Sequence, residues 1–348
     1  MDKGEDDMPL KQRKLAFLSI FILLLLTLVA CGGGDGSTES AGTGEGDTRV
    51  FKVSHVVQES HIWHLTAEKL NEELQERSDG RLSLEIYPAS QLGAEQDMVQ
   101  QLETGSIDFG FLTNAYMSTR EESLNAWFMP FLFSDLEEAA AMRESEEAQQ
   151  MLDSLESQGL IGLDFAFAGN RHILMTDGFV ESPDDLSGKK MRIIGSPAVQ
   201  MFWEETPAGP TAMPLSEVYT SLQTGVIDGM DIDLDALVTE KYYENSEYLT
   251  LTNHATFPTI IVMSKQTFDS LSEEDQEIVK TSLKNAVDWG VEEAIKREET
   301  NLQELKDLGV QVHEIDGSDF QEITDKVREE FAGRNEIIKS FIDRAEQE

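Results

Sequence analysis

Apolar and polar residues alternate with two different periods after residue 50, and these periods predict the secondary structure. Residues 50–57, VFKVSHVV, alternate with a period of two, which predicts a strand. Apolar positions then recur every three or four residues from Trp63 to about Ser78, which predicts a helix. A second strand over 82–87 and a second helix over about 94–103 follow. The succession of strand, helix, strand and helix is typical of an α/β fold.

A much longer helix is predicted near the carboxyl terminus. It begins after Ser272, where the run Ser-Glu-Glu-Asp forms a capping signature, and its apolar positions continue to Leu308. Such a helix is about 50 Å long, which exceeds the ~30 Å width of a small domain, so it must lie along more than one lobe. Gly290 is a candidate position for a bend. A coiled coil is the alternative, although the spacing is not a sustained heptad. Residues 320–345 predict one or two further amphipathic helices.

Two short segments of the chain repeat each other. Residues 102–108 read LETGSID and residues 222–228 read LQTGVID, so five of seven positions are identical. Each segment predicts a helix end, a left-handed glycine cap and the entry into a buried strand. The repeat predicts two lobes built on a similar plan, with a ligand-binding cleft between them. Coincidence at a common type of turn is the alternative.

The first thirty residues have the pattern of a lipoprotein signal peptide. Three basic residues precede an apolar run from Leu15 to Ala30, which ends at Cys31 and a glycine run. We expect cleavage before Cys31 and lipidation of that residue, so that residues 31–47 form a flexible tether on the outer face of the cell membrane. An uncleaved anchor is the alternative. Cys31 is the only cysteine of the sequence, so no intramolecular disulfide is possible.

Acidic residues dominate the composition and limit the partners of the protein. The formal net charge is −40 at pH 7, which disfavours nucleic acid and anionic lipid headgroups as partners of the globular surface. A saline or alkaline habitat is one explanation of this charge, and an ordinary solvated surface is the other.

The sequence lacks the common motifs of enzymes and metal sites. It contains no G-x-S-x-G, no H-E-x-x-H and no dinucleotide fingerprint after a strand. His61 and His64 are three residues apart, but no third ligand has a matching spacing. We therefore predict no metal, no cofactor and no catalytic residue.

Residues 188–229 contain the most specific candidate for ligand chemistry. Arg192 lies on a short apolar strand just before a helix and a turn, where a buried arginine needs an anion. Its guanidinium is a planar fork that fits a carboxylate bidentately, so an organic acid in a cleft is the expected partner. An internal salt bridge to one of the 67 acidic residues is the alternative.

The same stretch resembles the substrate-binding receptors of tripartite ATP-independent periplasmic (TRAP) transporters. Their signature is a KMR strand, a segment like GPTAMP and then SEVY-x-x-LQTGV-x-DG, and this chain has all three in order. The segments SHVVQESHIWHLTAEKL, RLSLEIYPASQLG, MPFLFSD and GNRHIL extend the resemblance over nearly the whole mature chain. It implies a type II-like periplasmic-binding-protein fold with two lobes and a long helix that spans both. We expect lobe I to comprise 48–168 plus 257–296, and lobe II 169–256 plus 297–348.

The resemblance also implies roles for individual residues. In such receptors the arginine of the KMR strand, here Arg192, forms the salt bridge to the ligand carboxylate, and Arg171 of the G-x-R turn assists it. The family commonly has Glu-Asn where this chain has Asp231 and Ile232, and often an aromatic residue where it has Leu215. These differences imply that the far end of the ligand is held differently from that in the sialic acid receptors.

Chain position adds five further candidates for ligand contact. Open α/β sheets bind ligands at the carboxyl ends of their strands. His61 and Trp63 follow the first strand, Thr113 and Asn114 follow the strand IDFGFL, and Tyr219 lies on the SEVY helix. Each of these positions fits a ligand contact and a scaffold role equally well.

Together these observations predict an extracytoplasmic receptor and not an enzyme. We expect it to bind a small organic acid, such as a C4-dicarboxylate, keto acid or sugar acid, to close around it, and to deliver it to the membrane permease of a TRAP transporter. A ligand-sensing lipoprotein receptor that signals to a membrane kinase is the alternative.

Overall fold

The computed structural model describes residues 48–347 of the chain. The predicted signal peptide (1–30), the lipidation site Cys31 and the tether (31–47) lie outside these described residues, so the three predictions stay untested. Within residues 48–347, no helix combines the length and the apolar character needed to cross a membrane.

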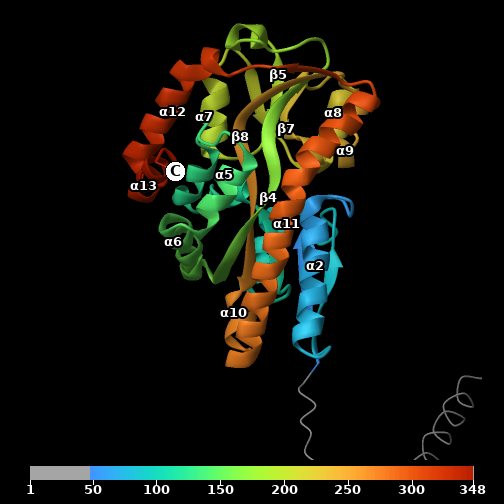
Figure 1. Ribbon diagram of the computed structural model, residues 1–348, viewed down its shortest axis with the longest axis vertical. Helices are drawn as coiled ribbons and strands as arrows, with labels where there is room; N and C mark the ends of the chain where they lie inside the picture. Colours follow the sequence, from blue (N-terminus) through green and yellow to red (C-terminus); the bar gives the residue numbers. More distant parts are fainter. Residues whose placement is uncertain (1–47, 348) are drawn as a thin grey trace, which may run out of the picture. The chain divides into compact units, whose positions relative to one another are not determined.

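One mixed β-sheet runs through the described chain, in the order β2-β1-β3-β8-β4-β7-β5-β6, with β9 beside β8. The long strands β4 and β8 pair antiparallel at its centre (Figure 1). On one side β1 pairs parallel with β2 and β3, and on the other β5 pairs parallel with β6 and β7. The strands are β1 (Arg49–His55), β2 (Leu82–Tyr87), β3 (Phe109–Thr113), β4 (Leu160–Met175), β5 (Lys190–Ile193), β6 (Gly209–Ala212), β7 (Gly229–Asp233), β8 (Tyr248–Ser264) and β9 (Gln311–Glu314).

Helices connect and cover the strands, which confirms the predicted α/β class. The α-helices are α2 (Ile62–Arg77), α3 (Glu95–Glu103), α4 (Asn114–Met117), α5 (Leu136–Ala141), α6 (Glu146–Ser154), α7 (Pro197–Glu204), α8 (Leu215–Gln223), α9 (Leu234–Thr239), α10 (Lys265–Asp269), α11 (Glu273–Asp307), α12 (Gln321–Arg334) and α13 (Glu336–Ala345), and the 3-10 helix η1 spans Glu122–Phe128. We call β1–β3 with α2 and α3 the first half, and β5–β7 with α8 and α9 the second half. The predicted lobe boundaries remain a prediction.

The two repeated segments occupy equivalent places in the two halves. Gly105 and Gly225 both have left-handed backbones, with φ of 69° and 70°, as the cap prediction requires. The carboxylate of Asp108 accepts a hydrogen bond from the backbone N–H of Lys52 in β1 at 2.8 Å. The carboxylate of Asp228 accepts the equivalent bond from Lys190 in β5, also at 2.8 Å. The repeat therefore reflects a shared local plan and not a coincidence.

Helix α11 connects the two halves along its length. It begins after Ser272, whose hydroxyl accepts a hydrogen bond from the N–H of Asp275, and continues as one 35-residue helix. It packs against α2 of the first half, against β4, and against α9 of the second half (Figure 1). This confirms the predicted long spanning helix. Gly290 lies inside it, and a Cβ atom there would overlap the hydroxyl of Thr66 on α2, so the missing side chain allows the two helices to approach closely.

Replacing Gly290 with Ala is expected to destabilise the protein by about 1–2 kcal/mol. The added methyl group must displace Thr66, and such overpacking costs about 1–3 kcal/mol, which the better helix propensity of Ala offsets by up to about 1 kcal/mol. Urea denaturation of the purified variant measures the change. Gly333→Ala in α12 is the control, because open space surrounds that position and the substitution should be neutral or stabilising.

A double variant tests whether the clash with Thr66 is the cause. Adding Thr66→Ala to Gly290→Ala should recover part of the lost stability, because the side chain in the way is then gone. Equal stability of Gly290→Ala and Gly333→Ala would refute the packing role of Gly290.

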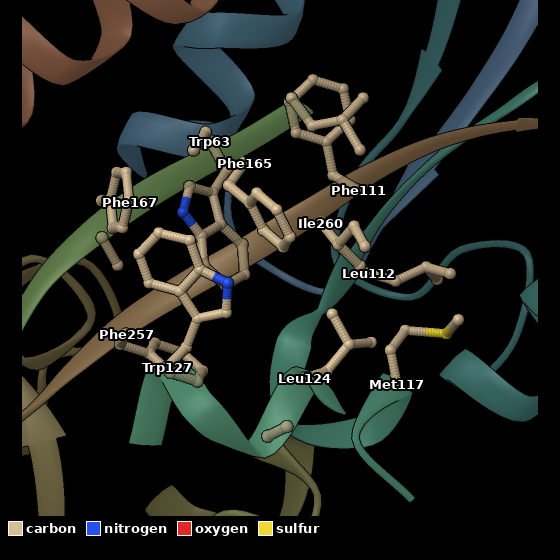
Figure 2. Packing of buried hydrophobic residues seen from close by; sticks show 14 of the residues in the cluster. Trp63, Phe111, Leu112, Met117, Leu124, Trp127, Phe165, Phe167, Phe257 and Ile260 are labelled. Atoms are coloured by element: carbon tan, nitrogen blue, oxygen red, sulfur yellow. The ribbon is translucent and has the colours of Figure 1, made fainter. Parts of the chain in front are cut away.

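Aromatic side chains fill the core around the long strands β4 and β8. The ring of Trp127 in η1 lies 4.9 Å from that of Phe165 in β4 and 4.8 Å from that of Phe341 in α13. The ring centroids of Trp63 in α2 and Phe257 in β8 are 5.4 Å apart. Figure 2 shows Trp63, Trp127 and Phe165 gathered around the two long strands. Dense packing of this kind holds rings in fixed positions, and Trp63 and Phe257 also face the cavity described next.

Candidate functional site

A cavity of about 470 Å³ lies at the carboxyl ends of the strands of both halves. This is the edge at which α/β sheets place ligands, and the volume is within the usual range for small-molecule sites. Residues that face the cavity include Val57, His61, Trp63, Glu95, Thr113 and Tyr116 from the first half, and Arg192, Ile194, Met213, Leu215 and Ile232 from the second half, with Arg171 and Phe257 from the central strands.

Arg192 on β5 keeps an unused donor at this cavity. Its side chain is buried, and its Nε and Nη2 atoms both donate to the backbone oxygen of Met213, at 3.1 and 3.0 Å. Its Nη1 atom is buried and has no hydrogen-bond partner. No carboxylate of residues 48–347 lies within ion-pairing distance of Arg192. Burial, together with the nearby charge of Arg171, lowers the pKa of Arg192, but a guanidinium remains charged at physiological pH.

Arg171 on β4 is already paired with two acidic side chains. Its Nη2 atom donates to the carboxylate of Asp231 at 2.9 Å, and its Nη1 atom donates to that of Asp233 at 3.1 Å. Both acids belong to β7, which pairs antiparallel with β4. The guanidinium lies over the ring of Phe257, 4.5 Å from its centroid. The Nε atom of Arg171 is buried and has no partner.

Asp231 acts on Arg171 and does not face the cavity. Its second carboxylate oxygen lies 3.7 Å from Nε2 of His254. Burial raises the pKa of Asp231, but the attraction of Arg171 and His254 outweighs this and holds the pKa below its ordinary value. Burial also lowers the pKa of His254. Asp231 is therefore an ionised support for Arg171, and it is not among the residues that line the cavity.

His61 and Trp63 lie together at the start of α2 and face the cavity. Nδ1 of His61 accepts the N–H of Trp63 at 3.1 Å, so His61 caps the helix. The indole Nε1 atom of Trp63 is buried and has no partner. Arg192, Arg171 and Trp63, which all line the cavity, thus each have a buried N–H group without a partner, as do Trp127 and Trp203 away from it.

Of the remaining predicted residues, the cavity brings together Thr113, Leu215 and Ile232. Asn114 and Tyr219 lie outside its lining. Asn114 is buried, and its amide donates to the backbone oxygen of Leu124 at 2.8 Å, which is a scaffold role. The hydroxyl of Tyr219 donates to Glu244 at the surface. Asn114, Tyr219 and Asp231 are thus not among the residues that line the cavity, and their predicted contacts with a ligand stay predictions.

Sequence reasoning missed Glu95, the first residue of α3. Its carboxylate accepts hydrogen bonds from the N–H of Thr113 at 2.6 Å and from the hydroxyl of Thr113 at 3.1 Å. Burial raises the pKa of Glu95 to about 7. An acidic residue in the first turn of a helix is common, and only its place at the start of the helix that follows β2 distinguishes Glu95 in the sequence.

Sequence reasoning also missed Asp235, which joins the two halves beside the cavity. Asp235 is buried in α9 and accepts the N–H of Ile62 at the start of α2, at 2.8 Å. It also accepts hydrogen bonds from Arg297 at 2.6 Å and Asn301 at 3.0 Å, both on α11. These four residues, which we call the Asp235 cluster, hold the start of α2 against the second half.

The described residues contain no group of three or more His, Cys, Asp or Glu side chains arranged to hold a metal ion. His64 instead lies with its Nδ1 atom 3.0 Å from Nε2 of His55, and His61 lies 3.6 Å from Asp235.

A cavity between two similar halves, with two arginines in its lining, is typical of proteins that bind small anionic solutes. Residues 53–335 match the family of bacterial extracellular solute-binding proteins, family 7 (DctP), and the chain belongs to this family. The membership confirms the resemblance to TRAP receptors that the KMR and SEVY segments indicated.

Relatives and solved structures support the same assignment. The 2,3-diketo-L-gulonate-binding periplasmic protein of Escherichia coli is 31% identical over 75% of this chain and 80% of its own length. The C4-dicarboxylate-binding periplasmic protein of Rhodobacter capsulatus is 28% identical over 82% of this chain and 87% of its own length. A TRAP periplasmic solute-binding protein from Sulfitobacter sp. NAS-14.1, solved with bound β-D-galacturonate, is 28% identical, with a TM-score of 0.79 over 84% of this chain and 98% of that one. The likeness confirms the predicted two-lobed periplasmic-binding-protein fold.

Proposed function

We propose that this protein is the receptor of a TRAP transporter for a small organic acid, whose carboxylate pairs with Arg192. The observation that carries the proposal is that Arg192 lines the cavity and keeps a buried Nη1 atom without a hydrogen-bond partner, with no acidic side chain in ion-pairing distance among residues 48–347. A carboxylate at this atom would satisfy the donor and neutralise the charge. Charge-assisted bonds of this type are about twice as strong as neutral ones.

Other contacts of the proposed carboxylate follow from the same cavity. Arg171 also lines the cavity and has a buried Nε–H without a partner, and Asp231 and Asp233 hold its guanidinium in place. Such preorganisation lowers the entropy lost on binding. Ile232 and Leu215 offer apolar surface where the family commonly has an amide and a ring, so they suit the carbon skeleton of the ligand.

Closure of the two halves would complete the site. Removal of water lowers the local dielectric constant and strengthens the pair between Arg192 and the carboxylate. The Asp235 cluster stabilises the arrangement in which α2 lies against the second half. In our proposal a membrane permease then receives the ligand, and a lipid on Cys31 keeps the receptor at the outer face of the membrane.

The relatives suggest which acids to test. Their ligands are 2,3-diketo-L-gulonate, C4-dicarboxylates and galacturonate, which are all carboxylates. A thermal-shift screen with galacturonate, glucuronate, a keto acid and succinate is expected to raise the melting temperature with at least one of them, because a ligand that binds only the folded state stabilises it by mass action. Isothermal titration calorimetry then gives the Kd.

Neutral analogues provide the control for this screen. The methyl ester of the acid that binds keeps its size and hydroxyl groups but has no carboxylate, so it should give no shift. Binding of neutral sugars without binding of any acid would refute the proposal.

A further inference from the structure

Hydrogen bonds from α9 and α11 fasten the turn that leads into α2. The carboxylate of Asp235 on α9 accepts the backbone N–H of Ile62, the first residue of α2, at 2.8 Å. Arg297 of α11 donates to the same carboxylate at 2.6 Å, and its Nη2 atom donates to the backbone oxygen of Ser60 at 3.0 Å. Figure 1 shows α2 and α9 beside successive parts of α11, and both helices pack against it. Asp235 thus links an element of each half to the helix that spans both.

Asp235 supplies the negative charge that the start of α2 lacks. The first N–H groups of a helix have no partner within it, and the helix dipole places a partial positive charge there. The first turn of α2 contains no acidic residue of its own. Asp235 comes from the other half and is 1% exposed, so water screens its attraction to the start of α2 only weakly. The bond between Ile62 and Asp235 is therefore a charge-assisted bond across the two halves.

The fastened turn also forms part of the cavity wall. His61 and Trp63, on either side of Ile62, line the cavity, and so does Ala236, which follows Asp235. Asp235 itself is not among the described residues that line it. A movement that separates α2 from α9 must therefore break the bond between Ile62 and Asp235, and it must also draw this wall away from the second half.

We infer that Asp235 is a positioning residue that holds the cavity closed around a bound acid without touching the acid. The inference rests on the proposed function, since it assumes an acid in the cavity. It adds a role for the Asp235 cluster, which acts as a clasp between the halves. The acid leaves only after the clasp opens, so Asp235 controls the dissociation rate. Association starts from the open arrangement and depends little on the clasp.

Asp235→Asn tests the clasp, because it keeps the shape of the side chain and removes its charge. A single amide oxygen cannot serve Ile62, Arg297 and Asn301 together, so the bond to α2 is weakened. Stopped-flow tryptophan fluorescence, with galacturonate and separately with succinate, measures both rates, and Trp63 in the cavity lining is the expected reporter. We expect the dissociation rate to rise at least about tenfold and the association rate to change less than about twofold.

Ile62→Pro removes the other partner of the same bond. Proline is tolerated at the first position of a helix, and the extended backbone of His61, with φ of −73° and ψ of 146°, suits a residue before proline. The dissociation rate should rise as in Asp235→Asn. Ile62→Val trims the same buried side chain but keeps the N–H group, so it should release the acid at nearly the wild-type rate. Asp269→Asn, which removes an exposed charge from α10, should leave both rates unchanged.

A double variant tests whether the two substitutions act through one bond. Asp235→Asn combined with Ile62→Pro should release the acid no faster than the faster of the two single variants, because each substitution removes the same interaction. Circular dichroism and a melting curve establish that the variants are folded. A residue that only stabilised the fold would lower the melting temperature without changing the dissociation rate of the folded protein.

Amide hydrogen exchange provides a readout that does not depend on rates of binding. The N–H of Ile62 has no partner within α2, so its protection from exchange depends on Asp235. Addition of galacturonate or succinate to wild type should slow exchange in a peptide that contains Ile62. Asp235→Asn should lose this protection.

The outcomes separate the clasp from the proposed function. If Asp235→Asn releases the acid at the wild-type rate, or if Ile62→Pro behaves like Ile62→Val, the clasp is refuted while the acid receptor stands. If wild type binds no acid of the panel, the proposed function fails. Exchange at Ile62 in the ligand-free proteins then decides the clasp: faster exchange in Asp235→Asn than in wild type supports it, and equal exchange refutes it.

Discussion

Arg192→Ala is expected to abolish measurable binding of the organic acid. The variant leaves the ligand carboxylate in a cavity whose main unpaired cation is gone, and loss of one partner of a buried charge pair costs about 2–5 kcal/mol. This corresponds to an increase in Kd of roughly thirtyfold to several thousandfold. Calorimetric titration with the acid that binds most tightly to wild type measures this increase in Kd.

Arg192→Lys distinguishes the planar fork from the charge alone. Lysine keeps a positive charge but cannot bond Met213 and a carboxylate with the same geometry, so it should recover little of the affinity. Arg120→Ala is a matched control, because Arg120 pairs with Glu103 at the surface and should leave Kd unchanged. Near wild-type affinity in Arg192→Ala would remove the role that we assign to this residue.

Arg171→Ala should be the most destabilising of the substitutions considered. The side chain that neutralises Asp231 and Asp233 would be lost, although both acids remain buried. Removing one partner of a buried ion pair costs about 3–5 kcal/mol, because an uncompensated charge remains. Urea denaturation at neutral pH, analysed for the free energy of unfolding, tests this value.

The pH dependence of this loss has a definite sign. In wild type the pKa of Asp231 is below its ordinary value, so its contribution to stability is present above the unfolded pKa and disappears as the pH falls through the folded pKa. The variant lacks this contribution. Its deficit relative to wild type should therefore be largest near neutral pH and should shrink as the medium becomes acidic.

A surface arginine provides the reference for this comparison. Arg334 pairs with Glu330 on α12, and both side chains are nearly half exposed. Arg334→Ala should cost less than about 1 kcal/mol, because exposed ion pairs contribute little. If Arg171→Ala were no more destabilising than this control, the ion pairs with Asp231 and Asp233 would not stabilise the fold as we describe.

Several elements of the fold could be predicted because their signals are local. The alternation over residues 50–57 identified β1, and the Ser272 cap identified the start of α11. The two LxTGxID segments indicated equivalent turns, and the structure shows the same aspartate contact in both. Each signal depends on residues within a few positions of one another, so the local backbone geometry is enough to predict the element from the sequence.

The candidate site could be predicted only in part. His61, Trp63 and Thr113 line the cavity, as their positions after strands suggested, and so do Arg192 and Arg171, which the family resemblance indicated. Their roles in binding stay predictions. Chain position could not distinguish Thr113 from its neighbour Asn114, because both lie at the end of the same strand. Only the packing shows that Thr113 lines the cavity and that Asn114 is buried in the core.

The sequence by itself determined the α/β class, the long helix, the repeated turn and the family, and it identified Arg192 as the principal cationic candidate. Only the tertiary structure decided which charged side chains have an oppositely charged partner. It pairs Arg171 with Asp233, 62 residues away, and joins Asp235 to Ile62, 173 residues away, while it leaves Arg192 and Glu95 without charged partners among the described residues. The physical reason is that periodicity and capping act between neighbours in the chain, whereas charge pairing depends on distances of a few ångströms that only the folded chain establishes.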